Sequence, residues 1–371
     1  MAYGDTAAGP NRDRLVAMCR TLIHRGPDDE GVYLDTHAGL AVRRLAVMDV
    51  ADGRQPVRDE RETIHVVFNG EIYNHGELRR QLARRGHRFR SGTDSEVIPH
   101  LYEEFGTDFP NRLEGMFAVA LWDAAERRLV LCRDRVGVKP LYYATTQHGI
   151  VFGSEIKAIL AAGVGTTVDL QALSDYLSLM YVPGPRSIYQ EIRKLPPATT
   201  LVWQPNGYKI RRYWDLRETT GRRDISPGDA ERELRELLIS SVDQQMRADV
   251  PLGFFMSGGL DSSSVVAAAR RLRPDETLRT FTVGFTDRSY DERRESALLA
   301  RHLGTRHTDL VVEPQAEDVV DRIAPIFDEP FADPSVIPTY YLCELARRHV
   351  TVALSGDGGD ELFAGYHSYK A

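Results

Sequence analysis

The sequence predicts two domains, an α+β domain followed by an α/β domain built on a doubly wound parallel sheet. Three observations lead to this prediction. Short β-rich runs separated by turns fill residues 39–162, and strands alternate with helices after residue 225. A segment with several prolines, residues 182–220, separates the two patterns. Since 371 residues with 42% hydrophobic content can fill two ordinary cores, we place the first domain at 1–216 and the second at 217–371.

In the first half, strands are expected in four β-rich runs. The turns between these runs contain Asp, Asn and Gly, which favours antiparallel pairing. Two helical patterns, residues 75–85 and 94–105, interrupt the strands, because apolar residues recur there at three- and four-residue spacing. The four runs are LAVRRLAVMDV, TIHVVFNGEIYN, FAVALWDAAERRLVLCRDR and LYYATTQHGIVFGSEI.

The second half begins with a charged amphipathic helix at residues 227–246 and then alternates strands and helices. This alternation predicts a parallel sheet, in which ligands gather outside the carboxyl ends of the strands. The expected strands are 250–256, 279–285, 308–312 and 350–354, and the further helices are 262–271, 290–303 and 338–349.

Composition argues against several classes of partner. The 47 Lys and Arg against 54 Asp and Glu leave a net charge of -7 with both signs interspersed, which favours neither a nucleic-acid nor an anionic-membrane surface. The longest apolar runs, such as Gly115–Trp122, are far shorter than the roughly 20 residues of a membrane span, and the first residues lack a signal-peptide pattern. The three cysteines lie far apart and fit neither a disulfide framework nor a metal site, so the reducing cytoplasm is the expected compartment.

The segment Ser257–Ser263, reading SGGLDSS, joins an apolar strand directly to a helix. Ser257, Gly258 and Gly259 let the backbone approach an anion closely, and Ser262 and Ser263 are expected to cap the helix. Asp261 adds a carboxylate suited to Mg²⁺. The lysine of GxxxxGK[ST] is missing, so we predict a loop for an enzyme that splits ATP into adenylate and pyrophosphate. The alternative is an ordinary strand-to-helix turn with Asp261 as a cap.

A second glycine-rich acidic turn, Ser355–Glu361 (SGDGGDE), follows another apolar strand. Both turns lie at the carboxyl ends of predicted strands, so both are expected to face one ATP. Asp357, Asp360 and Glu361 would supply metal ligands or contacts to the reacting groups. The alternative is a solvated acidic turn.

Several motifs occur together with these two turns: HRGPDDEG, RLAVMD, FNGEIYN, GTDSE, RDRVGVKPLYY and FGSEIKA. From about Met18 onward the chain resembles glutamine-dependent asparagine synthetase. The resemblance implies an αββα glutaminase of the N-terminal-nucleophile type, which releases ammonia from glutamine, followed by an ATP pyrophosphatase domain. That domain would activate L-aspartate with ATP and Mg²⁺ as β-aspartyl-AMP, which ammonia converts to asparagine, AMP and pyrophosphate. The resemblance is also compatible with a homodimer.

In the first domain, the resemblance implies a glutamine pocket. Arg44 and the backbone of its neighbours resemble one strand of this pocket, and those neighbours are Leu45, Ala46, Val47 and Met48. Asn69 and Gly70 resemble the oxyanion-stabilising pair, and Glu71 and Asp94 the groups that hold the substrate α-amino end. Two alternatives rest on local pattern alone: Asn69-Gly70 as a type I′ hairpin turn and Asp94 as a helix cap.

In the second domain, the resemblance implies an ATP site and a metal site. Met256 resembles a residue lining the adenine site, and Val283 one whose backbone meets the base. Asp261 and Asp360 resemble Mg²⁺ ligands, and Asp357 the acidic residue implicated in adenylate formation. The expected ATP contacts are Met256, Ser257, Gly258, Gly259, Asp261, Ser262, Val283, Ser355 and Gly356.

The sequence departs from the family at both ends. The family nucleophile is a cysteine directly after the initiator methionine, where this chain has Ala2, and the polar segment MAYGDTAAGPN gives no strand to carry it. Cys19 fits a helix as a packing residue and has no free amine, so we expect no glutaminase chemistry in the chain as given. The sequence stops at Ala371, before the family's catalytic lysine. We therefore expect a gene product truncated at both ends.

Three alternatives remain open from the sequence. One is a β-lactam synthetase-like cyclase, which would explain the missing cysteine but would leave the glutamine-pocket residues without a purpose. Another is an amidotransferase that acts on a glycan or peptide carboxylate, since the loops say little about the acceptor. The last is a non-catalytic nucleotide-binding relative, which the intact acidic residues of both turns disfavour.

Overall fold

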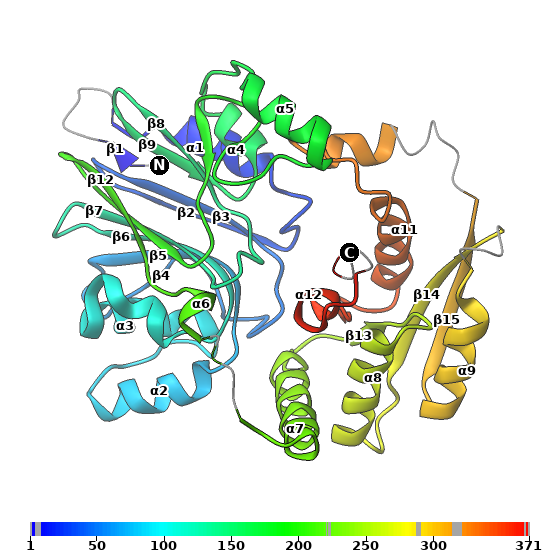
Figure 1. Ribbon diagram of the computed structural model, residues 1–371. Helices are drawn as coiled ribbons and strands as arrows, with labels where there is room; N and C mark the ends of the chain where they lie inside the picture. The colour runs from blue at the N-terminus through cyan, green and yellow to red at the C-terminus, as the bar shows by residue number, and fades with distance from the viewer. Residues whose placement is uncertain are drawn as a thin grey trace. The chain divides into compact units, whose positions relative to one another are not determined.

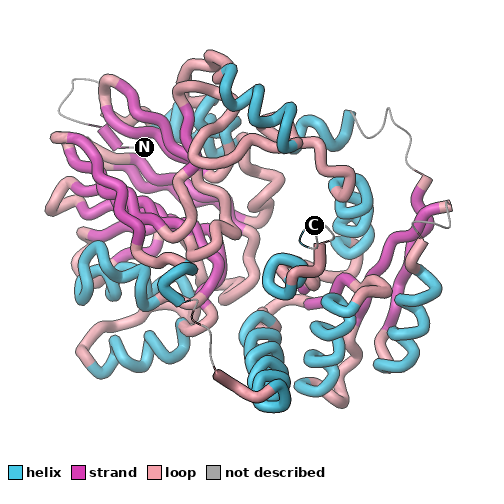
Figure 2. Tube along the Cα trace, in the orientation of Figure 1, coloured by secondary structure: helices cyan, strands magenta, loops and turns pink. Residues whose placement is uncertain are grey.

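Figure 1 shows the computed structural model of the chain, which describes residues 2–3, 9–219, 221, 224–286, 291–313, 321–366 and 369. The chain divides into two units. One unit comprises Met1–Gly221 with Phe327–Ala332, and the other comprises Arg222–Ile326 with Asp333–Ala371. Figure 2 distinguishes the helices, strands and loops of each unit and shows the strand-rich composition of the first.

Two antiparallel sheets stack in the first unit. The larger has the order β12-β11-β7-β6-β5-β4 and the smaller β1-β9-β8-β10, while β2 pairs with β3 alone. The core between them is apolar and includes Trp122 and Leu131 of the larger sheet and Tyr143 and Ile150 of the smaller. The larger sheet contains β4 (Val57–Arg58), β5 (Ile64–Ile72), β6 (Gly115–Asp123), β7 (Arg128–Arg133), β11 (Thr199–Gln204) and β12 (Gly207–Arg212). The other strands are β1 (Ala2–Tyr3), β2 (Asp29–Leu34), β3 (Gly39–Arg44), β8 (Tyr142–Thr146), β9 (Gly149–Gly153) and β10 (Ile192–Lys194).

Helices cover the outer faces of both sheets. On the larger sheet, α2 (His75–Arg84) and α3 (Val97–Phe105) share a core with its outward apolar side chains. On the smaller sheet, α1 (Arg12–Arg20) and α4 (Ile156–Leu160) do the same. The first unit is therefore the expected αββα sandwich. The remaining helices are η1 (Asp94–Glu96), η2 (Gly106–Arg112), α5 (Leu170–Leu179) and α6 (Leu216–Thr219).

The second unit contains the expected parallel sheet, with the order β15-β14-β13-β16. Its strands are β13 (Leu252–Phe255), β14 (Arg279–Phe285), β15 (Arg306–Val312) and β16 (Val352–Leu354). The chain proceeds outward from β13 to β15 and then returns to place β16 on the other side of β13. Strand order thus reverses between β13 and β16, and ligands of doubly wound sheets bind at such a switch point.

Helices cover both faces of this sheet (Figure 1). On one face, α7 (Pro227–Gln245), α8 (Leu260–Leu272) and α9 (Arg293–Leu303) share a core with β13 and β16. On the other face, α11 (Val336–Arg347) packs against Phe281. The shorter helices are η3 (Ala324–Ile326) and α12 (Gly359–Phe363). The expected helix start at residue 290 lies outside the described residues. No described helix combines the length and apolar character needed to cross a membrane.

Residues 327–332 lie far along the chain but pack within the first unit. Asp328 Oδ1 pairs with Lys157 Nζ at 3.1 Å, and Glu329 pairs with Lys194. Both carboxylates are largely buried, since their side chains are 10% and 15% exposed. We call residues 327–332 the docking segment; nothing in the sequence indicated this packing.

Candidate active site

Asn69 and Gly70 are neighbours within β5, opposite Ala118 and Phe117 of β6. They are strand residues, so the alternative that they form a hairpin turn is wrong. The side-chain amide nitrogen of Asn69 is buried and has no hydrogen-bond partner. A Cβ on Gly70 would meet the carbonyl oxygen of Met116 at 2.0 Å, so only glycine fits there. A buried amide donor without an acceptor is a group that a ligand oxygen can satisfy.

Two carboxyl groups lie next to this pair, the half-buried Glu71 and the buried Asp94. Burial and the nearby charge of Asp94 raise the pKa of Glu71 to about 8. Burial also raises the pKa of Asp94, although the Ile72 N–H donates to its Oδ2 at 2.7 Å. The cap residue of α3 is Glu96 and not Asp94, whose carboxylate instead holds β5. The two neighbouring carboxyl groups therefore resist ionisation unless a positive charge lies beside them.

Arg44 organises the loop that follows β3. Its Nη2 donates to the carbonyl oxygens of Met48 at 2.7 Å and of Asp49 at 2.8 Å. The Ala46 N–H donates to Asp28 Oδ2 at 2.9 Å. The β-rich run LAVRRLAVMDV therefore holds a strand only as far as Arg44, because the four residues that follow are held as a loop by these side-chain contacts.

Lys139 belongs to the same site, although we did not single it out from the sequence. Its charge lowers the pKa of Glu71, while burial and the nearby Arg25 lower the pKa of Lys139 itself. Its backbone N–H donates at 3.0 Å to Asp134 Oδ2, and the same oxygen accepts from the Phe117 N–H at 3.1 Å. The motif RDRVGVKPLYY contained Lys139, but only the fold brings its charge close to Glu71.

The sulfur nucleophile of the family has no counterpart at Ala2. A two-residue strand is nevertheless present, since Ala2 and Tyr3 pair with Ile150 and Gly149 of β9. The prediction that no strand occurs in this segment was therefore wrong, because short backbone pairing along a sheet edge needs no apolar pattern. Cys19 lies buried in α1, where burial raises its pKa to about 11, as expected for a packing residue and not for a nucleophile.

The loop after β13 is fixed by its own hydroxyl groups. The Ser257 N–H donates to Ser262 Oγ at 3.1 Å, and the Gly259 N–H donates to Ser257 Oγ at 3.1 Å. Helix α8 begins at Leu260 with Gly259 as its cap residue, so the predicted capping by Ser262 and Ser263 was wrong. These serines lie in the first turn of the helix, and Ser262 instead ties the start of the loop to that turn.

The two glycine-rich turns pack directly against each other. A Cβ on Gly356 would lie 2.6 Å from the backbone nitrogen of Ser262, and one on Gly359 would lie 2.6 Å from Asp261 Oδ2. Within the second turn, Ser355 Oγ donates to Asp357 Oδ2 at 2.8 Å. The turns therefore form one surface at the switch point between β13 and β16, as the sequence predicted.

The remaining expected ATP contacts differ in exposure. Met256 is only 2% exposed and its side chain belongs to the core, while its N–H donates to the Phe281 carbonyl oxygen at 2.9 Å. Val283 is half-buried in β14 and pairs with Leu310 of β15. Gly258 is exposed, and its N–H donates to Glu292 Oε2 at 3.2 Å. The small, partly exposed groups of the two turns are thus better placed to meet a ligand than Met256 is.

Comparison with known proteins gives two family matches. The family described as Glutamine amidotransferase domain matches residues 3–214, and the family described as Asparagine synthase matches residues 233–371.

Curated relatives match nearly the whole chain. "Asparagine synthetase [glutamine-hydrolyzing] 1" of Bacillus subtilis is 37% identical over 95% of this chain and 56% of its own length. "Putative asparagine synthetase [glutamine-hydrolyzing] 2" of Methanocaldococcus jannaschii is 36% identical over 96% of this chain and 73% of its own length. "Asparagine synthetase B [glutamine-hydrolyzing]" of Escherichia coli is 33% identical over 96% of this chain and 62% of its own length. The chain therefore spans between about half and three quarters of these relatives. Since both domain families match in the order that the two folded units follow, the chain belongs to the family of glutamine-hydrolysing asparagine synthetases.

Proposed function

We propose that this chain is a carbon–nitrogen ligase that uses ATP to activate L-aspartate. A side-chain carboxylate oxygen of aspartate attacks the α-phosphorus of ATP, and pyrophosphate leaves. Ammonia then attacks the acyl carbon of β-aspartyl-AMP, so that AMP leaves and the nitrogen loses a proton to give L-asparagine. The observation that carries this proposal is the packing of Gly356 and Gly359 against the loop of Asp261, which brings two phosphate-binding turns together.

The two turns would contact different parts of ATP. Ser257, Gly258 and Gly259 offer small side chains and backbone N–H groups to the phosphates at the start of α8. Ser262 keeps this loop in shape, and Ser355 and Gly356 approach the nucleotide from the second turn. Met256 would line the adenine site, and the backbone of Val283 would meet the base. Asp357, oriented by Ser355, takes part in forming the adenylate.

The acidic residues of the two turns fit Mg²⁺. Gly359 lies against the Asp261 carboxylate and directly precedes Asp360, so one carboxylate from each turn is available. Mg²⁺ in nucleotide sites is usually held by one or two carboxylates together with substrate phosphates. Asp261 and Asp360 would hold the ion, which neutralises phosphate charge when bound.

The first domain keeps the parts of a glutamine pocket. We assign the α-amino group of glutamine to Glu71 and Asp94, two neighbouring carboxyl groups whose ionised forms a bound ammonium group would stabilise. The unpaired amide nitrogen of Asn69 and the backbone of Gly70 would stabilise an oxyanion, and one such donor is worth about 3 to 4 kcal/mol in comparable enzymes. Arg44 and the loop Leu45–Met48 would form the wall of the pocket.

The experiment incubates the protein, produced from its full-length gene, with ATP, Mg²⁺ and ammonium, and measures AMP and pyrophosphate. We expect both products in equal amounts with aspartate. Other carboxylic acids test the acceptor, including β-amino acids, peptides and uronic acids. Turnover with one of these acids and not with aspartate would show that this acid, and not aspartate, is the acceptor. Binding of ATP without release of AMP would show that the protein binds nucleotide but is not a ligase.

A further inference from the structure

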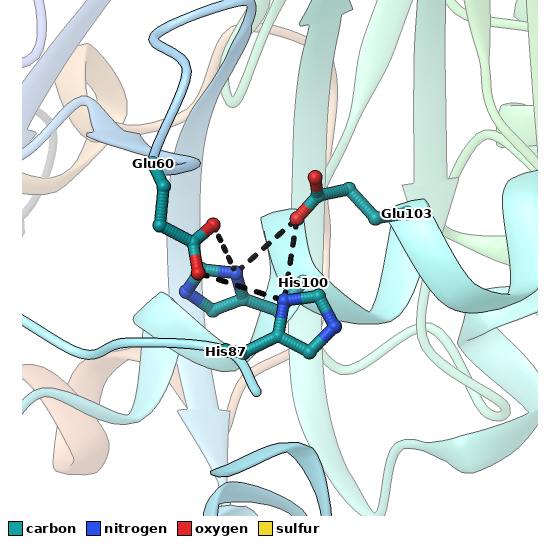
Figure 3. A group of neighbouring side chains, drawn as sticks. All are labelled: Glu60, His87, His100 and Glu103. Atoms are coloured by element: carbon teal, nitrogen blue, oxygen red, sulfur yellow. Dashed lines mark hydrogen bonds and ion pairs between the residues drawn. The ribbon is translucent and has the colours of Figure 1, made fainter. Parts of the chain in front are cut away.

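Four side chains that neither half of the proposed reaction uses converge on the outer helical layer of the first unit. Glu60 lies in the turn between β4 and β5, and His87 follows the end of α2. His100 and Glu103 lie three residues apart on one face of α3. One ligand atom from each residue can be chosen so that all four lie within 4.8 Å of one another. Figure 3 shows both carboxylates pointing toward the two imidazole rings.

The distances are close to metal-ligand spacing, and one of them, between His100 Nδ1 and Glu103 Oε2, is also a long hydrogen bond. His100 Nδ1 is 3.3 Å from Glu60 Oε2 and 3.4 Å from Glu103 Oε2. His87 Nδ1 is 3.7 Å from Glu60 Oε1 and 3.5 Å from Glu103 Oε2. A charge-assisted N–H···O bond would measure about 2.7 to 2.9 Å. Ligands held at roughly 2.0 to 2.2 Å around tetrahedral Zn²⁺ are separated by about 3.3 to 3.6 Å.

The outer contacts of the cluster leave the inner nitrogen of His87 free to coordinate. His87 Nε2 lies 3.1 Å from Glu104 Oε1 and can donate its proton there. The Nδ1 lone pair of that tautomer would face the two carboxylates, and a cation between them would bind all three groups. A carboxylate that accepts from the outer nitrogen of a ligating histidine is the usual support in protein zinc sites.

Burial of His100 favours a metal ion over a second proton. Its side chain is 1% exposed and its Nε2 is buried without a hydrogen-bond partner. A charged imidazolium there would place a positive charge in the interior, which is costly. A neutral imidazole bound through Nδ1 avoids the buried charge. The edge of the Phe89 ring against His100 adds apolar surroundings on that side.

The charges around the cluster also balance for a divalent cation. Glu60 and Glu103 carry two negative charges, and Arg85 pairs with Glu104 behind His87. Two carboxylates and two neutral imidazoles would therefore cancel the charge of one divalent ion.

We propose that Glu60, His87, His100 and Glu103 form a structural Zn²⁺ site that fixes the β4–β5 turn to α2 and α3. Four protein ligands leave no open position for substrate, which is typical of structural and not of catalytic zinc. Zn²⁺ is the choice among divalent ions because two imidazole and two carboxylate ligands suit it, whereas Mg²⁺ prefers six oxygen ligands.

The test uses the full chain after treatment with EDTA. Titration with Co²⁺ should give the intense visible absorption of four-coordinate cobalt, saturating at one ion per chain, and one equivalent of Zn²⁺ should abolish it. Excess Mg²⁺ should not. A variant with Asp261→Asn and Asp360→Asn should keep the signal, so failure of the proposed ATP site would not disturb this measurement.

Variants assign the ligands. His87→Gln and Glu103→Gln should each abolish the four-coordinate spectrum, and Glu104→Gln should weaken Zn²⁺ binding by about 10- to 100-fold. His148→Gln, on the β8–β9 hairpin, is the matched control and should bind as the parent chain does. Far-ultraviolet circular dichroism checks that each variant is folded. If a variant does not fold, the cobalt spectrum of the parent chain alone decides whether the site exists. The weak spectrum of six-coordinate cobalt in the parent chain, or a four-coordinate spectrum retained in folded His87→Gln, would overturn the proposal.

Discussion

Replacing Gly356 with alanine is expected to push the two glycine-rich turns apart. The new Cβ would lie 2.6 Å from the Ser262 nitrogen and 2.9 Å from the Asp261 carbonyl carbon, whereas ordinary contact begins at 3.4 Å. One turn would therefore have to move by about 0.8 Å, the difference between 3.4 and 2.6 Å. Because both neighbours are backbone atoms, no side-chain rotation can relieve the contact.

The size of the effect follows from that displacement. A misplacement of about 1 Å in a site that positions reacting groups costs roughly 100-fold in rate, so we expect Gly356→Ala to slow AMP formation by about 10- to 100-fold. The assay measures AMP release with ATP, aspartate and ammonium, alongside ATP binding by calorimetry. Gly228→Ala in α7 is the matched control, because a Cβ there meets nothing within 4 Å. A folded Gly356→Ala chain that turns over within about twofold of the parent would refute the reasoning about this contact.

Three further predictions concern the first unit. Because Glu71 has a raised pKa of about 8, against 4.5 for an ordinary glutamate, the folded chain retains a proton that the unfolded chain releases. The free energy of unfolding should therefore fall as pH rises from about 4.5 to 8, and Glu71→Gln should flatten this dependence in urea titrations; an unchanged slope would contradict it. Asp94→Asn should weaken L-glutamine binding in calorimetry by about 10- to 100-fold, while the surface control Glu77→Gln should leave the affinity unchanged. Equal affinities in the two variants would show that Asp94 does not contact glutamine. Lys194→Met should lower the melting temperature because it leaves Glu329 buried without its cation, and adding Glu329→Gln should restore part of the loss; a double variant less stable than the single one would exclude this pair as the cause.

The second domain could be predicted closely from its sequence because each element is locally encoded. The strand at residues 279–285 has the expected bounds, and the loops SGGLDSS and SGDGGDE follow β13 and β16 as predicted. Parallel strands direct both loops to one edge, so their meeting follows from topology. The start of α8 was misplaced, since the pattern of serines suggested a cap where Gly259 takes that position.

The missed features depend on contacts between distant parts of the chain. Lys139 acts on Glu71 only because the sandwich brings β5 and the loop after β7 together. His87 and His100 lie 13 positions apart on the outer helical layer, and neither the spacing nor the composition suggested a metal site. The docking segment joins the first unit through two ion pairs whose partners lie more than 130 positions earlier. Local sequence pattern predicts helices, strands and turns, but it does not reveal contacts between residues that lie far apart in the chain.

Isotope transfer tests the central claim most directly. Aspartate carrying heavy oxygen in its side-chain carboxylate is incubated with the chain, ATP, Mg²⁺ and ammonium, and the AMP is analysed by mass spectrometry and phosphorus NMR. If β-aspartyl-AMP forms, one carboxylate oxygen stays on phosphorus when ammonia displaces AMP, so each AMP should carry one heavy oxygen. AMP without the label, or ADP and phosphate in its place, would contradict adenylation of aspartate at the paired turns.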